Sequence, residues 1–76
     1  MGNRLSDLNK GATGVIGAID RPDLEIALMK VGLVRGDRFL LSDRAPFGGP
    51  IALLVNGHKV ALRRSDAALI SIDPLP

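Results

Sequence analysis

The dipeptide Asn56-Gly57 separates two apolar runs, 51–55 and 58–62, and it constrains the fold more than any other feature of the sequence. Both residues tolerate the positive φ that a two-residue type I′ turn requires, so the sequence predicts a β-hairpin. The pairs that this register predicts are Val55–His58, Leu53–Val60 and Ile51–Leu62. These six side chains share one face and five are aliphatic, so we expect that face to line the core.

Three further stretches have the composition of strands, and one has the pattern of a helix. The other predicted strands are 12–19, 38–44 and 69–72. Pro22 suits the first turn of a helix, where its missing N–H is no loss, and Leu24, Leu28 and Val31 recur at helical spacing. We expect the helix to pack through that stripe and to end at Gly32, a common C-terminal cap.

These elements predict one domain over residues 1–76 that is mainly β. A chain of 76 residues has too few residues left for parallel crossovers, so the sheet should be antiparallel. A small, bent sheet that closes on itself avoids open edges. We therefore expect a small five-stranded SH3-like barrel with one α-helix inserted after the first strand. Gly14 and Gly17 in that strand suit a bulge or a sharply coiled strand.

The sequence contains little that supports catalysis or cofactor binding. It has no cysteine and a single histidine, His58, so a thiolate or histidine metal site lacks partners. Ser6 with Asp7, and Ser65 with Asp66, have no base placed to activate a serine, and we expect them to cap turns. We therefore predict no enzyme activity, no cofactor and no metal, and we assign His58 a structural or solvent-facing role.

Charge and hydropathy narrow the possible partners and compartment. Ten basic and eight acidic residues give a net charge of +2, which is too mild for the concentrated basic face of a nucleic-acid binder. The N-terminal stretch has no long apolar run, so we expect neither a secretory signal nor a membrane span. A cytoplasmic protein that does not bind nucleic acid fits both observations.

Three apolar side chains are candidates for contact with a partner. Phe47, one of only two aromatic residues, lies in the turn 45–51, which contains two prolines and two glycines. It either tucks back over the barrel or stands exposed as a preorganised anchor. Ile26 and Met29 lie off the apolar stripe of the predicted helix, on its outer side. Apolar residues on a polar surface mark a contact site when they cluster.

Three basic residues complete the partner-binding hypothesis. Lys59 and Arg63 share the outer face of the hairpin, and Arg44 lies on the outer face of the strand 38–44. A solvated outer face is the favoured interpretation, and a binding patch is the alternative.

Several segments resemble the FeoA family, the ferrous iron transport protein A family. They are "LMKVGLVRGDRF", "APFGGPI" and "VALRRSDAALISI". The family's Leu-Gly-Leu-x-x-Gly segment falls on 31–36, its Ala-Pro-Leu-Gly-x-Pro-Ile turn on 45–51, and its Leu-Arg-x-x-x-Ala-x-x-Ile ending on 62–70. The segment 4–11 is similar to the family's opening, so the resemblance spans nearly the whole chain.

Three positions depart from the family's pattern. Val31 replaces a usual Leu, Arg35 a common Pro, and Phe47 a usual Leu. The last change keeps an apolar tip but enlarges it, which bears on the fit to a partner rather than on the family.

The resemblance implies a small cytoplasmic SH3-like barrel that accompanies the FeoB permease in bacterial ferrous iron uptake. Such a protein acts by contact with the GTP-hydrolysing permease, and it meets the membrane only through that permease. The alternative is a free-standing relative of the SH3-like C-terminal domain of iron-dependent repressors, binding a regulator or a peptide. Self-association stays open.

Overall fold

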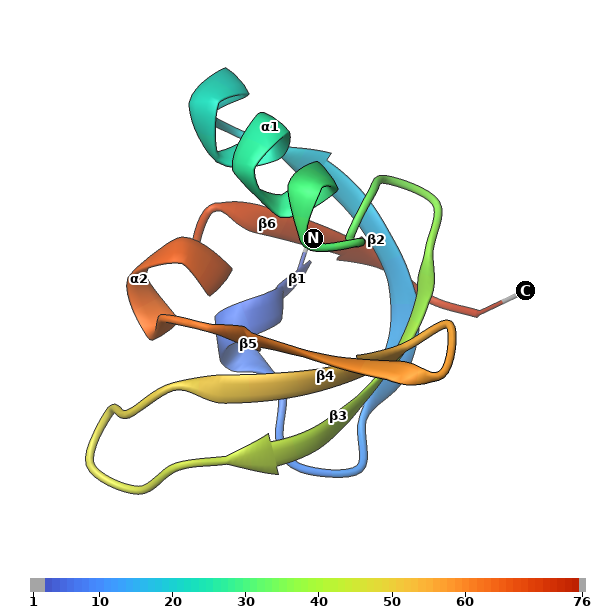
Figure 1. Ribbon diagram of the computed structural model, residues 1–76. Coiled ribbons are helices and arrows are strands. Elements are labelled where there is room, and N and C mark those ends of the chain that lie inside the picture. Colours follow the sequence, from blue (N-terminus) through green and yellow to red (C-terminus); the bar gives the residue numbers. More distant parts are fainter. Residues whose placement is uncertain (1–2, 76) are drawn as a thin grey trace.

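The computed structural model describes residues 3–75, which form one antiparallel sheet with two helices (Figure 1). The strands are β1 (Asn3–Arg4), β2 (Thr13–Ile19), β3 (Arg38–Arg44), β4 (Ile51–Val55), β5 (His58–Leu62) and β6 (Ile70–Asp73). The helices are α1 (Pro22–Lys30) and α2 (Arg64–Ala67), and a 3-10 turn, η1 (Leu5–Asp7), follows β1. The strand order in the sheet is β1-β6-β2-β3-β4-β5. This arrangement confirms a mainly β fold with one principal helix.

The strand count and the closure of the sheet differ from the prediction. A sixth strand, β1, pairs with β6 through Asn3↔Ile72 and Arg4↔Ser71, so α1 follows the second strand. The two end strands of the order, β1 and β5, do not pair with each other within residues 3–75. The sheet curls around the core without closing, and η1 and α2 contact each other at the gap (Figure 1). Two-residue strands carry no periodicity, which is why the sequence pattern missed β1.

The β4–β5 hairpin has the predicted register. Val55 pairs with His58, Leu53 with Val60 and Ile51 with Leu62. The five aliphatic residues of that face are buried, whereas His58, at the hairpin end, is exposed. They join one core cluster: Leu5, Ile16, Leu28, Leu33, Phe39, Leu41, Ile51, Leu53, Val55, Val60, Leu62, Ala67 and Ile70. The pairing of β2 with β6 shifts register between Ile16 and Ile19, where Gly17 lies, so the predicted bulge is present.

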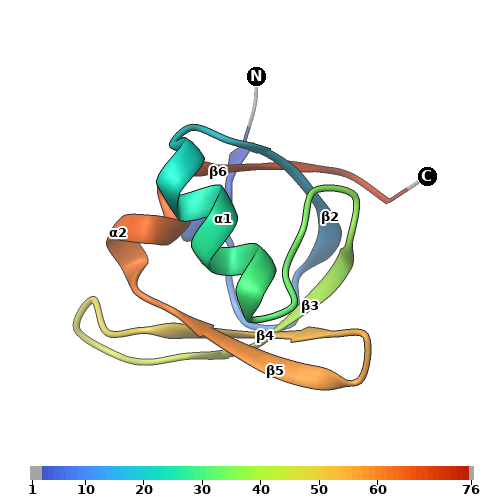
Figure 2. The same cartoon turned by 45° about the horizontal axis from the view of Figure 1, so that its top comes forward.

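Helix α1 covers one end of the curled sheet (Figure 2) but does not use the whole predicted stripe. Leu28 is buried and Leu24 is half-buried, whereas Val31 is 54% exposed. Gly32 takes a φ of +90° and ends the helix, so the next inward side chain is Leu33 rather than Val31. The helix ends where the sequence predicts, but the expected contact through Val31 is wrong, because Val31 is the C-cap and its backbone, at φ −101° and ψ 10°, has already left helical geometry.

The expected serine cap of the second helical segment is also wrong. The N-cap of α2 is Arg63, without a side-chain cap bond, and Ser65 lies inside the helix. At η1 the expected cap is present, since the Arg4 backbone N–H donates to Asp7 Oδ2 at 3.3 Å.

Arg44 ties the third strand to the N-terminal segment. Its Nη1 donates to the backbone carbonyl of Ser6 at 3.1 Å and also to that of Leu8. These carbonyls belong to the turn that lies against the open side of the sheet, so the guanidinium satisfies backbone acceptors there. Arg44 is thus engaged within the fold rather than projecting outward.

Replacing Arg44 with Met should reduce the free energy of unfolding by about 1.5–3 kcal/mol, since hydrogen bonds from a charged donor to the two carbonyls are lost. Lys59→Met is the matched control, because it also removes a cation and its exposed ion pair is worth at most about 1 kcal/mol. Urea unfolding followed by far-UV circular dichroism measures both. Equal losses in the two variants would show that the Arg44 contacts do not stabilise the fold.

Candidate functional site

Among residues 3–75, no three His, Cys, Asp or Glu side chains are grouped so that they could hold a metal ion. In the same range, no helix is long and apolar enough to cross a membrane. The site has therefore to be sought among surfaces.

His58 lies against the end of α1. A Cβ atom built on Gly32 would stand 2.6 Å from His58 Nε2, so the imidazole ring packs over the glycine. The ring is nevertheless exposed to solvent on its other side. The single histidine therefore links the hairpin end to the helix end, which combines the two roles expected for it.

A hollow beside α1 brings the two predicted helix residues together. Ile26 and Met29 are 51% and 56% exposed, and Val34, in the loop after the helix, is 40% exposed. With Glu25 and Arg35 they line a hollow of about 270 Å³. Val34 and Arg35 were not expected here, because helical spacing gives no information about residues beyond the C-cap. We call this hollow the helix groove.

Phe47 stands clear of the protein. Its relative exposure is 104%, so the tucked conformation is excluded and the exposed one is observed. The backbone around it turns tightly, with the Ala45 N–H donating to the Pro50 carbonyl at 3.0 Å and the Gly49 N–H donating to the Pro46 carbonyl at 3.2 Å. In Figure 1 and Figure 2 the turn projects from the end of the sheet, well away from α1. Phe47 and the helix groove are therefore separate surfaces.

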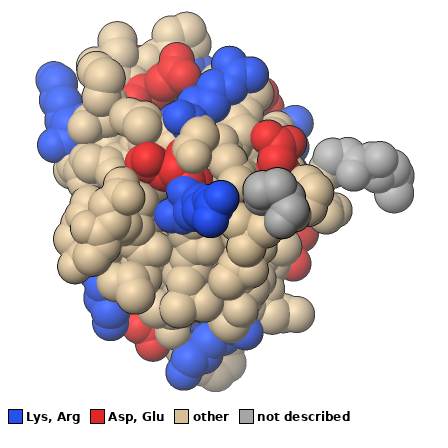
Figure 3. All heavy atoms as spheres, turned by 90° about the vertical axis from the view of Figure 1, so that its right-hand side faces the viewer, with Lys and Arg blue, Asp and Glu red and all other residues tan. Residues whose placement is uncertain are grey.

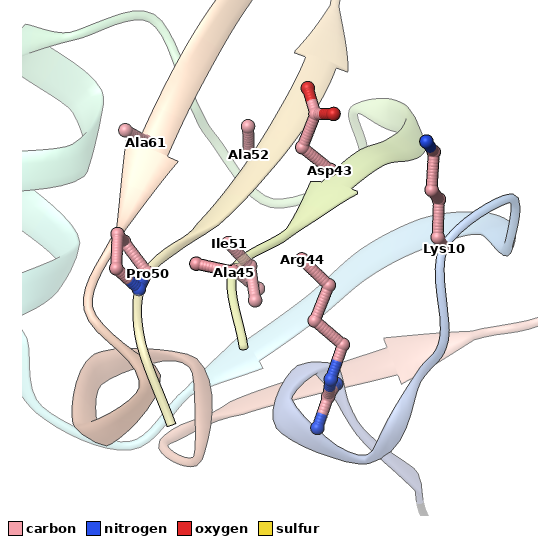
Figure 4. A pocket seen from close by; sticks show the side chains of 8 residues that line it. All are labelled: Lys10, Asp43, Arg44, Ala45, Pro50, Ile51, Ala52 and Ala61. Carbon is pink, nitrogen blue, oxygen red and sulfur yellow. The ribbon is translucent and has the colours of Figure 1, made fainter. Parts of the chain in front are cut away.

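A second hollow, of about 340 Å³, lies on the outer face of the sheet (Figure 4). Its lining residues are Lys10, Asp43, Arg44, Ala45, Pro50, Ile51, Ala52 and Ala61. Figure 4 shows the Arg44 side chain extending away from the alanines toward η1, where its hydrogen bonds lie. The floor is built from small side chains, and the Asp43 carboxylate and Arg44 guanidinium already have partners, so within residues 3–75 Lys10 is the one charged lining residue without a partner.

The predicted basic residues of the hairpin are engaged with acidic neighbours. Lys59 Nζ lies 3.2 Å from Asp43 Oδ2, and Arg63 Nε lies 3.3 Å from Asp66 Oδ2. The hydrogen bond from Lys59 holds the pKa of Asp43 below its usual value. Figure 3 shows acidic and basic side chains interspersed on one face of the molecule. These pairs favour a solvated outer face over a basic patch.

The sequence and the fold are similar to those of known proteins. The family model described as "FeoA domain" matches residues 3–74. No curated protein matches the chain.

Solved structures include several similar proteins. The solution structure of the FeoA protein from Chlorobium tepidum is 32% identical, with a TM-score of 0.87, and the match covers 97% of this chain and 71% of that one. A FeoA-like protein from Clostridium acetobutylicum is also 32% identical, with a TM-score of 0.81 and coverage of 99% and 88%. A manganese-dependent transcriptional repressor is 22% identical, with a TM-score of 0.85, over 97% of this chain and 42% of that chain. The repressor shares the fold, and the predicted SH3-like class is confirmed.

Gly32→Ala should destabilise the protein, because the new Cβ meets the His58 ring and alanine is strained at a φ of +90°. We expect a loss of more than about 1 kcal/mol, and a smaller loss when the same change is made in a His58→Ala background, where only the backbone strain remains. Thermal unfolding of the four proteins in the cycle measures the difference. Identical losses in both backgrounds would show that the ring does not lie against Gly32.

The protein alone should bind ferrous iron weakly or not at all. The described residues bring together no cluster of metal ligands, and the sequence has one histidine and no cysteine. Anaerobic calorimetric titration with Fe(II) measures this. A stoichiometric site with a micromolar or tighter Kd would contradict the prediction.

Proposed function

Because this chain belongs to the FeoA family, we propose that it is a cytoplasmic accessory protein of ferrous iron uptake. It acts by contact with the cytoplasmic domain of a FeoB-type permease, and it performs no chemistry of its own. It reaches the membrane only through that permease.

The observation that carries a contact function is the helix groove. Ile26, Met29 and Val34 expose large apolar side chains next to one another, between the charges of Glu25 and Arg35. Exposed apolar residues that cluster and are rimmed by polar groups are typical of protein contact sites. The groove gives a partner apolar area to bury.

The likeness to the repressor supports the fold alone, since the two chains are 22% identical. It brings no regulator-binding function to this chain. The same binding experiment separates the two alternatives, because a repressor-like module has no reason to bind a permease.

Met29→Ala should weaken association with the purified cytoplasmic domain of the permease about thirtyfold, since truncating a true anchor costs about 2 kcal/mol or more. Ile26→Ala should act in the same direction. Isothermal titration calorimetry measures the affinity, after thermal unfolding has shown that each variant is folded.

Leu75→Ala is the matched control, because Leu75 is also an exposed large apolar residue and lies outside the groove. Its affinity should equal that of the native chain. If the native chain does not bind the permease domain, the proposed function is wrong. If it binds and both groove variants bind equally well, the contact surface lies elsewhere.

A further inference from the structure

The turn that carries Phe47 has a backbone that an aromatic residue rarely adopts. Phe47 has a φ of 58° and Gly48 a φ of 75°, and the Gly49 N–H donates to the Pro46 carbonyl at 3.2 Å. Two successive positive φ values closed by such a bond define a type I′ turn, whose central positions strongly prefer Asn, Asp and Gly. For a bulky residue such as Phe the left-handed conformation is strained. Phenylalanine at position 47 therefore destabilises the fold.

Packing of the Phe47 side chain does not compensate this strain. The Phe47 side chain is fully exposed at 104%, so it fills no part of the core and covers no neighbour. Residues with strained backbone cluster at binding and catalytic sites. Phe47 is thus held out, on a turn stiffened by Pro46 and Pro50, with its side chain ready for burial in another molecule.

A second feature lies beside this turn. Gly48, Gly49 and Pro50 form one wall of a hollow of about 420 Å³, and the other wall consists of Arg63, Arg64 and Ser65. Arg64 Nη1 is 3.8 Å from the position that a Cβ on Gly48 would take. The two glycines leave no side chain between the turn and the guanidinium.

The Arg64 guanidinium has no hydrogen-bond or ion-pair partner within residues 3–75, unlike that of its neighbour Arg63, which pairs with Asp66. Arg64 is partly buried, whereas the other basic side chains without a partner in that range are exposed: Lys10, Lys30, Arg35 and Arg38. A guanidinium with its donors unengaged is suited to a carboxylate, which it binds with two parallel hydrogen bonds.

We propose that Phe47 and Arg64 form one docking surface for an acidic segment of the permease's cytoplasmic domain. This inference rests on the proposed function and names a surface apart from the helix groove. The ring of Phe47 enters an apolar pocket of the partner, and an Asp or Glu at the rim of that pocket reaches Arg64 across the two glycines. Charge complementarity selects the acidic partner, and the strained turn presents the ring without further ordering.

Phe47→Asn and Arg64→Gln test the surface in calorimetric titrations against the purified permease domain. Asn suits the left-handed conformation, so Phe47→Asn should raise Tm by about 4–8 °C while weakening binding about thirtyfold. Arg64→Gln should weaken binding about tenfold and reduce its dependence on salt. Arg38→Gln is the control, because it removes an exposed and unpaired cation outside the surface. Its affinity for the permease domain should equal that of the native chain.

The outcomes separate this inference from the proposed function. If the native chain binds the permease domain and Phe47→Asn and Arg64→Gln bind as tightly, the docking surface is refuted while the proposed function stands. If the native chain does not bind that domain, both are wrong. A Tm of Phe47→Asn at or below that of the native chain would show that phenylalanine does not strain the backbone there, and would contradict the inference. A change in the sedimentation mass of the protein alone on Phe47→Asn would instead place this surface between two copies of the chain and overturn the proposal.

Discussion

Burial of the inner face of the β4–β5 hairpin is the interaction on which the rest of the structure depends. Leu53, Val55 and Val60 are at most 4% exposed and share one cluster with Leu28 of α1 and Leu5 of η1. A domain of this size buries only about 60% of the surface that its unfolded chain exposes, so few inward positions can be left unfilled. The helix, the N-terminal turn and the hairpin are thus held by the same apolar contacts. Helix α1 depends on these contacts, because it is too short to be stable alone.

The curled sheet leaves backbone carbonyls of the N-terminal segment without partners in a strand, and Arg44 hydrogen-bonds to them. The sheet does not close within the described residues, and η1 lies against the gap with carbonyls that no strand satisfies. Arg44 reaches the carbonyls of Ser6 and Leu8 from β3. Arg44 thus gives these carbonyls the hydrogen bonds that a further strand would give them in a closed barrel. A residue that looks from the sequence like part of a basic surface is therefore structural.

The sequence predicts the features that follow from local geometry. It misses those that depend on contacts between segments far apart in the chain. The hairpin register follows from Asn56-Gly57 and period-two alternation, and the structure has the same pairs. The predicted burial of Val31 is wrong because this residue is the C-cap, outside helical geometry, and β1 is too short to show a pattern. The helix groove is only half predictable, because Ile26 and Met29 have helical spacing and Val34 does not. The strain at Phe47 could not be foreseen, since residue type alone does not assign φ to a turn that contains two glycines.

The two exposed surfaces differ in how they are held, and this decides what each can contribute to a complex. Met29 is a flexible side chain on a helix face, and such side chains adapt to a partner at a cost in rotamer entropy. Phe47 has two side-chain torsions and a backbone fixed by prolines and a type I′ turn, so it loses little freedom on binding. A backbone strain of about 1–3 kcal/mol is a large share of the stability of a small domain, commonly about 5–15 kcal/mol. The groove therefore supplies adaptable apolar area, while the turn supplies a fixed point that sets the orientation of the partner. Because the turn lies well away from α1 and α2 lies between them (Figure 1), a partner that contacts both surfaces has to extend across the α2 side of the molecule, and we expect substitutions in the two surfaces to have additive effects on its binding free energy.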